Sequence, residues 1–219
     1  LSSLSSARVI DPFCGDGRLL ATLADRIASM PSLRAMEWRF ELWDNDENGL
    51  DSARANVTSA LARNKLRGGV LCHHKDSFLE SKDAFGTFDI VLTNPPWEAI
   101  KPDRRELKSF SPGERGCYER ALKSYDLRLA EMLPRSQPDA KLYGWGTNLS
   151  RCGLELSLEL LSPRGICGIV LPSSILADQV SVGLRRWTLR RFRICSIDYY
   201  PAETKPFEHV DQPCITMVM

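Results

Sequence analysis

Hydrophobic positions along the chain follow two patterns: short apolar runs typical of buried strands, and longer segments whose apolar residues recur three or four positions apart. The first run, Ala7–Asp11, ends in an acid and a proline. The segment 17–30 then keeps helical spacing until Pro31 stops it. Repeated along the chain, these patterns predict strands at 38–43, 70–74, 88–93, 165–172, 194–201 and 214–219, and helices at 47–66, 149–161 and 183–192.

Because strands alternate with helices, we predict an α/β fold with a doubly wound, mostly parallel sheet of seven strands. Residues 98–147 break the alternation and are rich in proline and charge, so we expect an insertion there, partly helical around 115–133. A turn at 162–165 should precede the fifth strand. The chain has no initial Met and enters a strand almost at once. We therefore expect residues 1–219 to be one domain of a longer protein.

Composition narrows the class of protein. The chain has 219 residues, 43% hydrophobic and 26% charged, which is typical of a globular domain with a sizeable core. It shows no membrane-length apolar run and no secretory signal, so we expect a cytoplasmic protein. Seven scattered cysteines lack paired zinc spacing, and His73-His74 is interpreted as a strand end, so no metal site is expected. A net charge of +1 gives no overall indication of nucleic-acid binding.

The first predicted turn reads DPFCGDG and spans residues 11–17. Gly15 and Gly17 let the backbone approach a ligand closely, and the helix that follows offers free N–H groups. A dinucleotide site would need a third glycine where Leu20 stands. The acids Asp11 and Asp16 would repel a pyrophosphate but suit a cationic ligand such as S-adenosylmethionine, whose ammonium either could neutralise. Pro12 and Cys14 belong to the same candidate site.

Acidic residues also follow the second and third predicted strands. Asp44, with Asn45 beside it, stands where an acid can bind both ribose hydroxyls, and Asp46 is the near alternative. Asp76, followed by Ser77, could accept a hydrogen bond from the cofactor's adenine amine. Taken singly each acid could be an ordinary loop carboxylate. Because acids follow three successive predicted strands and a glycine turn lies among them, together they predict a nucleoside site.

The fourth predicted strand ends in Asn94-Pro95-Pro96-Trp97. The prolines lack N–H donors and fix φ, which leaves carbonyl oxygens rigidly aimed. The Asn94 side-chain oxygen and the Pro95 carbonyl can then accept two hydrogen bonds from one amine. Trp97 offers a flat face on which a base extruded from a duplex could stack. The alternative is a proline turn with a core Trp, and the glycine turn upstream makes it the weaker interpretation.

These motifs resemble those of S-adenosylmethionine-dependent amino-methyltransferases acting on adenine in DNA, with the gamma-type order in which the cofactor turn precedes NPPW. The later segments resemble the methylase part of type IIG restriction-modification enzymes: NPPWEAIK, TNLSRCGLELSLELLSPRG, IVLPSSILAD and the tail 184–218, which carries an F-x-x-V stretch at 207–210. The resemblance implies a Rossmann-like methyltransferase fold, S-adenosylmethionine as cofactor, DNA as partner, a flipped adenine as target, and a target-recognition region outside this sequence.

Two basic segments could contact DNA phosphates. One is 184–193, with five arginines, and the other is Lys101–Lys108. Each could equally be a solvated, charged surface. Trp187 and Phe192 are predicted to be core residues. Tyr143 and Trp145 could touch DNA or pack within the protein.

Two rival functions stay open. The same Asn-Pro-Pro grip could serve an RNA base or a glutamine amide, and the domain could be a non-catalytic scaffold of a defence protein. The restriction-type tail favours DNA over the first, and the intact NPPW and glycine turn weigh against the second.

Overall fold

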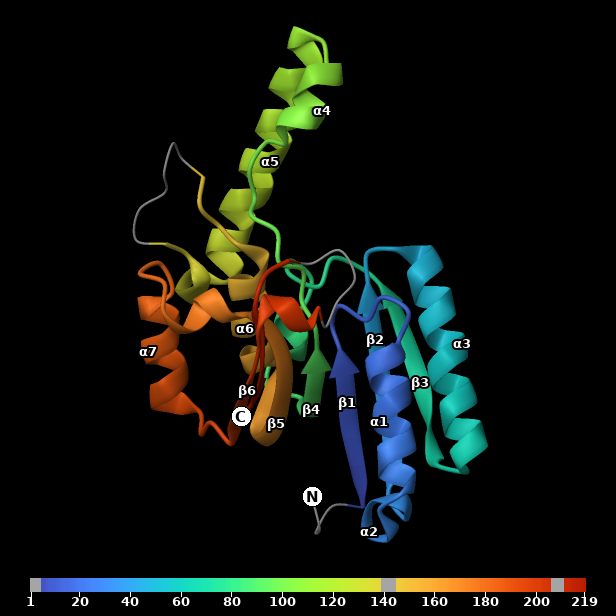
Figure 1. Cartoon of the computed structure of the whole chain (residues 1–219). Helices are drawn as coiled ribbons and strands as arrows, with labels where there is room; N and C mark the ends of the chain where they lie inside the picture. The colour runs from blue at the N-terminus through green and yellow to red at the C-terminus, as the bar shows by residue number, and fades with distance from the viewer. Residues whose placement is uncertain (1–4, 139–144, 206–210) are drawn as a thin grey trace.

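A single sheet of seven strands organises the protein (Figure 1). The computed structural model describes residues 5–138, 145–205 and 211–219; the F-x-x-V stretch and Tyr143 lie outside them. The strand order is β3-β2-β1-β4-β5-β7-β6, and only β7 runs antiparallel to its neighbours. The strands are β1 Ser6–Asp11, β2 Glu37–Asp44, β3 Arg67–His74, β4 Phe88–Thr93, β5 Leu161–Pro172, β6 Ser196–Tyr200 and β7 Cys214–Val218. The predicted α/β class and seven mostly parallel strands are confirmed.

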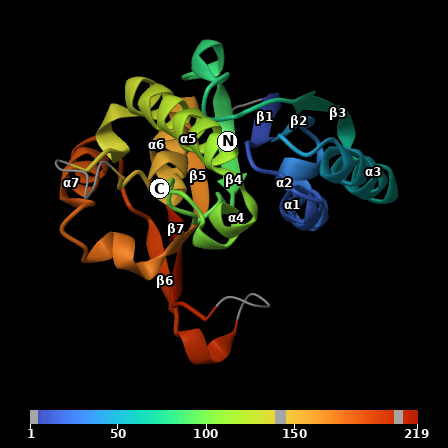
Figure 2. The same cartoon turned by 90° about the horizontal axis from the view of Figure 1, so that it is seen from above.

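Helices cover the sheet on both faces (Figure 2). They are α1 Arg18–Ala28, α2 Pro31–Arg34, α3 Glu47–Asn64, α4 Arg104–Ser109, α5 Pro112–Met132, α6 Leu149–Leu160 and α7 Val182–Arg191, with 3-10 turns η1 Lys82–Ala84, η2 Pro134–Ser136, η3 Ser173–Leu176 and η4 Ala202–Thr204. Neighbouring side chains of a strand face opposite sides of the sheet. Val9 therefore packs with α1 and α3, whereas Ile10 joins the core around α6. No helix in the described ranges is long and apolar enough to cross a bilayer.

Two strands begin three or more residues before their predicted starts. β3 begins at Arg67 rather than at residue 70, because Gly68 adopts φ +144° against the backbone of Trp38, where a Cβ would have no room. The predicted turn at 162–165 lies within β5, where the register with β4 jumps from Phe88–Leu161 to Ile90–Ile166. Residues 162–165 thus form an irregularity within β5 and do not make a separate turn before it.

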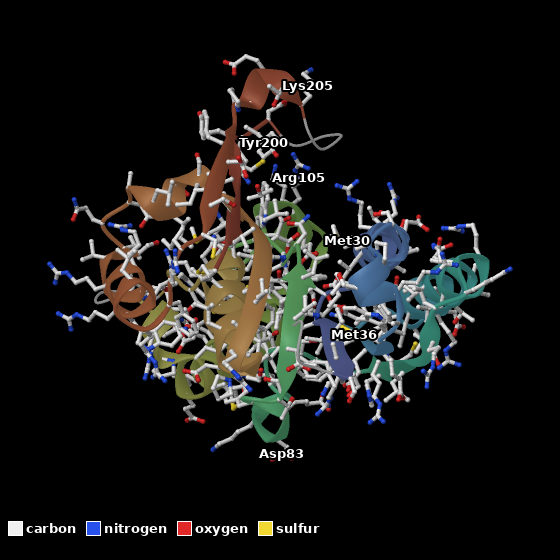
Figure 3. All side chains as sticks on the ribbon, turned by 90° about the horizontal axis from the view of Figure 1, so that it is seen from below. Met30, Met36, Asp83, Arg105, Tyr200 and Lys205 are labelled. Carbon is white, nitrogen blue, oxygen red and sulfur yellow. The ribbon has the colours of Figure 1, made fainter. Side chains whose placement is uncertain are left out.

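Charged side chains project from the outer helices, and α7 carries a group of them at the edge of the molecule away from α3 (Figure 3). Arg185 is the exception among the α7 arginines, since its Nη1 donates to the carbonyls of Ile175 (2.9 Å) and Asp178 (2.7 Å). Trp187 and Phe192 have ring centroids 5.5 Å apart and pack against the core, as predicted.

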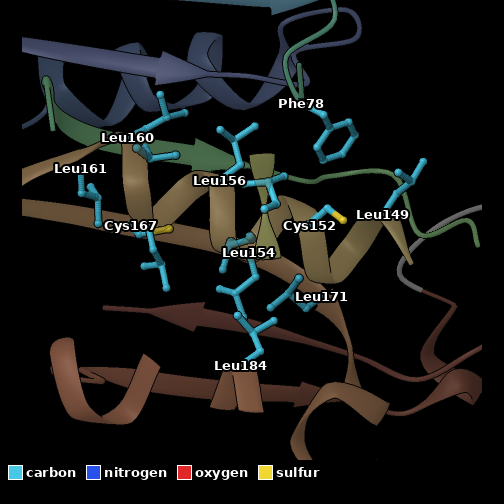
Figure 4. Close-up of a cluster of buried hydrophobic side chains, with 14 of the residues drawn as sticks. Phe78, Leu149, Cys152, Leu154, Leu156, Leu160, Leu161, Cys167, Leu171 and Leu184 are labelled. Atoms are coloured by element: carbon cyan, nitrogen blue, oxygen red, sulfur yellow. The ribbon is translucent and has the colours of Figure 1, made fainter. Parts of the chain in front are cut away.

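Helix α6 is buried on nearly every side (Figure 4). Its apolar residues fill the space between the sheet and α7, and two of its three charged residues form hydrogen bonds within the protein. Glu155 accepts hydrogen bonds from the backbone N–H groups of Arg135 (3.1 Å) and Ser136 (2.7 Å). Arg151 donates to the carbonyls of Ser136 and Gly146. These bonds fasten η2, which follows the long segment containing α4 and α5, onto α6.

Candidate active site

The carboxyl ends of β1, β2, β3 and β4 meet at one edge of the sheet because these strands are parallel neighbours. A cavity of about 380 Å³ opens there. Its position beside the β1–β4 pair is where doubly wound sheets bind ligands. The lining residues are Pro12, Phe13, Gly15, Asp44, Asn45, Lys75, Asp76, Ser77, Phe78, Asn94, Pro96, Glu98, Tyr125 and Leu149.

The two glycines of the first turn have different surroundings. Both have positive φ, +49° at Gly15 and +76° at Gly17. Gly15 lines the cavity, and a Cβ added there would meet no atom within 4 Å. A Cβ on Gly17 would lie 2.8 Å from the Cα of Ala53 in α3. Gly15 therefore keeps the ligand side open, whereas Gly17 allows α1 and α3 to pack closely.

Asp44 ties the end of β2 to the glycine turn. Its Oδ2 accepts a hydrogen bond from the N–H of Gly15 (2.8 Å), and its Oδ1 accepts from the N–H of Asp46 (3.0 Å). Asp46 does not line the cavity; it caps α3 by accepting from the N–H groups of Asn48 and Gly49. Of the two predicted ribose ligands, Asp44 is thus the one in the cavity wall.

The two acids of the glycine turn lie outside the cavity lining. Asp11 is 1% exposed; its Oδ1 accepts from Thr93 Oγ1 (2.6 Å) and from the N–H of Phe13 (3.1 Å). Burial raises the pKa of Asp11 to about 7, against the lowering effect of these two hydrogen bonds and with a smaller contribution from the charge of Asp44. Asp16 pairs with Arg18 (2.7 Å), whose hydrogen bond lowers the pKa of Asp16. Cys14 is buried beneath the turn.

The segment after β3 continues the cavity wall beside the glycine turn. Asp76 Oδ1 accepts from the N–H of Phe78 (2.9 Å), and Ser77 Oγ donates to the carbonyl of Pro12, which joins this wall to the glycine turn. Lys75 Nζ lies 3.3 Å from the ring centroid of Trp43 and donates to the carbonyl of Glu80 (3.1 Å). Burial lowers the pKa of Lys75.

The Asn94–Trp97 segment is divided between the cavity and the core. Asn94 and Pro96 line the cavity. The Asn94 Oδ1 atom is buried and has no hydrogen-bond partner within the described part of the chain. Pro95 is buried against Gly153 of α6, where an added Cβ would lie 2.3 Å from the Pro95 Cβ. Trp97 is partly buried beside the cavity and is absent from its lining; its carbonyl accepts from Asn148 Nδ2 (3.4 Å).

Six lining residues were not among the predicted site residues: Phe13, Lys75, Phe78, Glu98, Tyr125 and Leu149. Phe13 and Phe78, with ring centroids 4.7 Å apart, adjoin predicted residues and could have been found from that adjacency. Tyr125 comes from α5, inside the segment predicted as an insertion, and nothing in its local sequence points to the cavity.

The segments considered for DNA contact lie away from the cavity lining. Residues 101–108 form the approach to α4 and most of that helix. Trp145 packs beneath Lys123, whose Nζ lies 3.7 Å from the ring centroid. Within the described ranges, no group of three or more His, Cys, Asp or Glu side chains could hold a metal ion.

Several solved structures share the fold at low identity. One, from Listeria monocytogenes, is provisionally assigned as a class I S-adenosylmethionine-dependent methyltransferase: TM-score 0.62, 14% identity, 99% of this chain and 54% of that chain covered. A DrdV–DNA complex has TM-score 0.63 and 14% identity over 96% of this chain and 23% of the other. A nuclease-deletion mutant of the type ISP restriction-modification enzyme LlaGI, bound to a DNA substrate mimic, has TM-score 0.61 and 14% identity. The match covers 100% of this chain and 23% of the LlaGI chain.

This chain thus spans about half of the first structure's length and about a quarter of the other two. No curated protein sequence matches the chain. The family model of the Eco57I restriction-modification methylases matches residues 33–207, which include all the strands from β2 to β6. That match covers well over half of the sequence, and the chain therefore belongs to the Eco57I restriction-modification methylase family.

Proposed function

We propose that the protein transfers a methyl group from S-adenosylmethionine to the N6 amine of adenine in DNA, as part of a restriction-modification or phage-defence protein. The observation that carries the proposal is the buried, unpartnered Asn94 Oδ1 in the described structure, at the cavity that also contains Gly15, Asp44 and Asp76. A buried acceptor without a donor is costly unless a ligand supplies one. An exocyclic amine is such a donor.

The residues of the cavity fit S-adenosylmethionine. A volume of about 380 Å³ falls in the range of small-molecule sites. The open side of Gly15 admits a ligand against the backbone. The carboxylates of Asp44 and Asp76 can accept from hydroxyl and amine groups, and Glu98 adds a third negative charge suited to a cationic molecule. Phe13 and Phe78 provide aromatic surface.

In this proposal Asn94 and Pro95 hold the target amine. The Asn94 Oδ1 accepts one of its hydrogens and the Pro95 carbonyl accepts the other, which aims the nitrogen lone pair into the cavity. Neither Pro95 nor Pro96 carries a competing N–H donor. Trp97 stacks on the extruded base. Bound S-adenosylmethionine supplies the electrophilic methyl group; the chain's own contribution is orientation and electrostatic complementarity.

The roles of the two acids of the glycine turn are also part of the proposal. Asp11 or Asp16 neutralises the ammonium of the cofactor, and Cys14 and Gly17 support the turn that carries Pro12 and Gly15. Asn45 and Ser77 line the cavity beside the two carboxylates and help to seat the nucleoside.

DNA is favoured as the substrate because the chain belongs to a restriction-modification methylase family. The DNA complexes among the structurally similar proteins agree with this choice. The whole protein would add a target-recognition region, since the solved chains that it resembles are longer. Methylation of an RNA base or of a glutamine amide, and a scaffold without activity, are outcomes that the following experiment distinguishes.

The test offers radiolabelled S-adenosylmethionine and, in parallel, unmethylated DNA, RNA and a glutamine-containing peptide to the full-length protein. Label should enter DNA as N6-methyladenine. Asn94→Ala should lower the rate by about 100-fold or more, because the amine loses one of its orienting acceptors. Asn48→Ala, at an exposed position in the first turn of α3, is the matched control and should keep the parental rate.

Calorimetry with S-adenosylmethionine accompanies the assay. Binding without label transfer to any substrate would favour the scaffold, and transfer to RNA or peptide alone would replace the DNA assignment. Parental DNA methylation by Asn94→Ala would overturn the proposed grip on the amine.

A further inference from the structure

Asn94 lies between two residues that are held by different parts of the fold. Pro95, which follows it, packs against Gly153 of α6. Thr93, which precedes it, is the last residue of β4 and is completely buried. Because the backbone of Asn94 is continuous with both neighbours, the direction in which its amide points depends on how each of them is held.

Backbone pairing between strands holds Thr93 from the β5 side. There the register between β4 and β5 continues to the pair Thr93–Ile169. On the β1 side, the paired residues end at Ile10–Val91, two residues earlier along β4. The two strands lie next to each other, with their carboxyl ends at the same edge of the sheet (Figure 1). The end of β4 therefore needs another contact to hold it against the end of β1.

The side chains of Asp11 and Thr93 provide that contact. Thr93 Oγ1 donates a hydrogen bond to Asp11 Oδ1 (2.6 Å), and the same oxygen accepts from the N–H of Phe13 (3.1 Å). Asp11 is 1% exposed and Thr93 0%, so water does not compete for the bond. A bond from a hydroxyl to a carboxylate is among the stronger hydrogen bonds in proteins. It ties β4, one residue before Asn94, to the glycine turn that begins at Asp11.

We propose that Thr93 is a positioning residue for methyl transfer: its hydroxyl, bound to Asp11, fixes the Asn94 amide relative to the cofactor side of the cavity. The inference rests on the proposed function, because it assumes that Asn94 holds the target amine and that the cofactor lies over Gly15. Thr93 does not line the cavity and acts through Asn94. A shift of about 1 Å in a group that orients the reaction can lower its rate about 100-fold, so a contact outside the cavity can control the reaction.

The experiment measures single-turnover methylation of DNA by the full-length protein, with S-adenosylmethionine and DNA both saturating. Thr93→Val keeps the side-chain shape without the hydroxyl and should lower the rate by about tenfold, because Asn94 is less well fixed. Thr93→Ser keeps the hydroxyl and should restore a rate close to that of the parent. Thr87→Val, just before β4, removes a hydroxyl that binds the carbonyl of Ala84; it is the matched control and should keep the parental rate.

A binding measurement separates positioning from damage to the cavity. 5′-Methylthioadenosine carries the nucleoside part of the cofactor and has no ammonium group, so it does not need the charge of Asp11. Its Kd, measured by calorimetry, should be the same in Thr93→Val as in the parent. Thr93→Ala, which also lacks the hydroxyl, should match Thr93→Val in rate, and it decides the question if the valine variant does not fold.

The hydrogen bond itself can be checked from the pH dependence of stability. Burial raises the pKa of Asp11 to about 7; the Thr93 hydrogen bond and then the Phe13 N–H lower it, and the charge of Asp44 on β2 raises it slightly. The nearby Cys14 thiol stays protonated, because burial and then the charge of Asp11 raise its pKa. Thr93→Val should raise the pKa of Asp11 further. The loss of unfolding free energy with rising pH, which ends near pH 7 in the parent, should then continue to higher pH.

Four results would overturn the positioning role while leaving the proposed function intact. They are a parental rate in Thr93→Val, a rate in Thr93→Ser as low as in Thr93→Val, a loss of affinity for 5′-methylthioadenosine that matches the loss of rate, and an unchanged pH dependence of stability in Thr93→Val. If the parent methylates RNA or a glutamine peptide in place of DNA, the same comparison is made on that substrate. Absence of transfer to any of the three substrates would overturn the proposed function, and this inference with it.

Discussion

The two sides of the cavity are built differently. The wall made by the glycine turn and the ends of β2 and β3 is held by hydrogen bonds to the backbone of the loops: Asp44 accepts from the N–H of Gly15, and Asp76 accepts from the N–H of Phe78. The wall around Asn94 depends on elements far away in the chain, since Pro95 rests on Gly153 and Tyr125 arrives on α5. The first wall therefore depends on the backbone conformation of the loops at the strand ends, and the second on how the helices dock.

This contrast predicts that backbone changes matter most on the glycine side. Gly17→Ala should lower the free energy of unfolding by about 4 kcal/mol, because the new Cβ is strained at φ +76° and collides with Ala53. Gly15→Ala, with positive φ but open surroundings, should cost about 1 kcal/mol. Urea denaturation measures both. Equal losses of unfolding free energy in the two variants would show that the clash with α3 costs nothing beyond the backbone strain.

A pH dependence should arise at Asp11, which joins the two walls. Its pKa in the folded protein, about 7, is above the ordinary value of 3.8, so the folded state binds more protons between these limits. Stability should therefore be greatest below pH 4 and fall as the pH rises toward 7, by up to about 1.4 kcal/mol per pH unit from this group. Asp11→Asn should remove that contribution.

Denaturant unfolding from pH 4 to 7.5, with Asp16→Asn as the exposed control, checks the expectation. The Asp16 pKa is lowered, so its contribution has the opposite sign. If the slope of unfolding free energy against pH is the same in Asp11→Asn, another group is responsible for the pH dependence.

The smallest expected effect is at the outer end of α5. Ser111→Ala removes the capping hydrogen bond to the N–H of Glu114 and should destabilise the helix start by about 1 kcal/mol. Hydrogen exchange should speed up in the first turns of α5, while the turns around Leu129 keep their protection. Ser124→Ala, an exposed mid-helix change, is the control. Faster exchange throughout α5 would contradict the picture of a helix anchored independently at its inner end.

The sequence predicted what is local in this molecule. Strand ends, the glycine turn and the positions of Asp44 and Asp76 follow from short patterns, because parallel strands bring their carboxyl ends together. Burial of Asp11 under Thr93 could not be predicted, since it depends on how β1 pairs with β4. The same holds for Tyr125: its place in the cavity results from the docking of α5, which periodicity within the helix does not encode.

The close approach of Gly153 to Pro95 has a consequence for redesign. Helix α6 is the most enclosed of the described helices. Replacing a helical glycine with alanine is a common way to stabilise a protein. Here the extra methyl group would push directly against the proline that adjoins Asn94. An alteration within the hydrophobic interior would then misalign the Asn94 amide that lines the cavity.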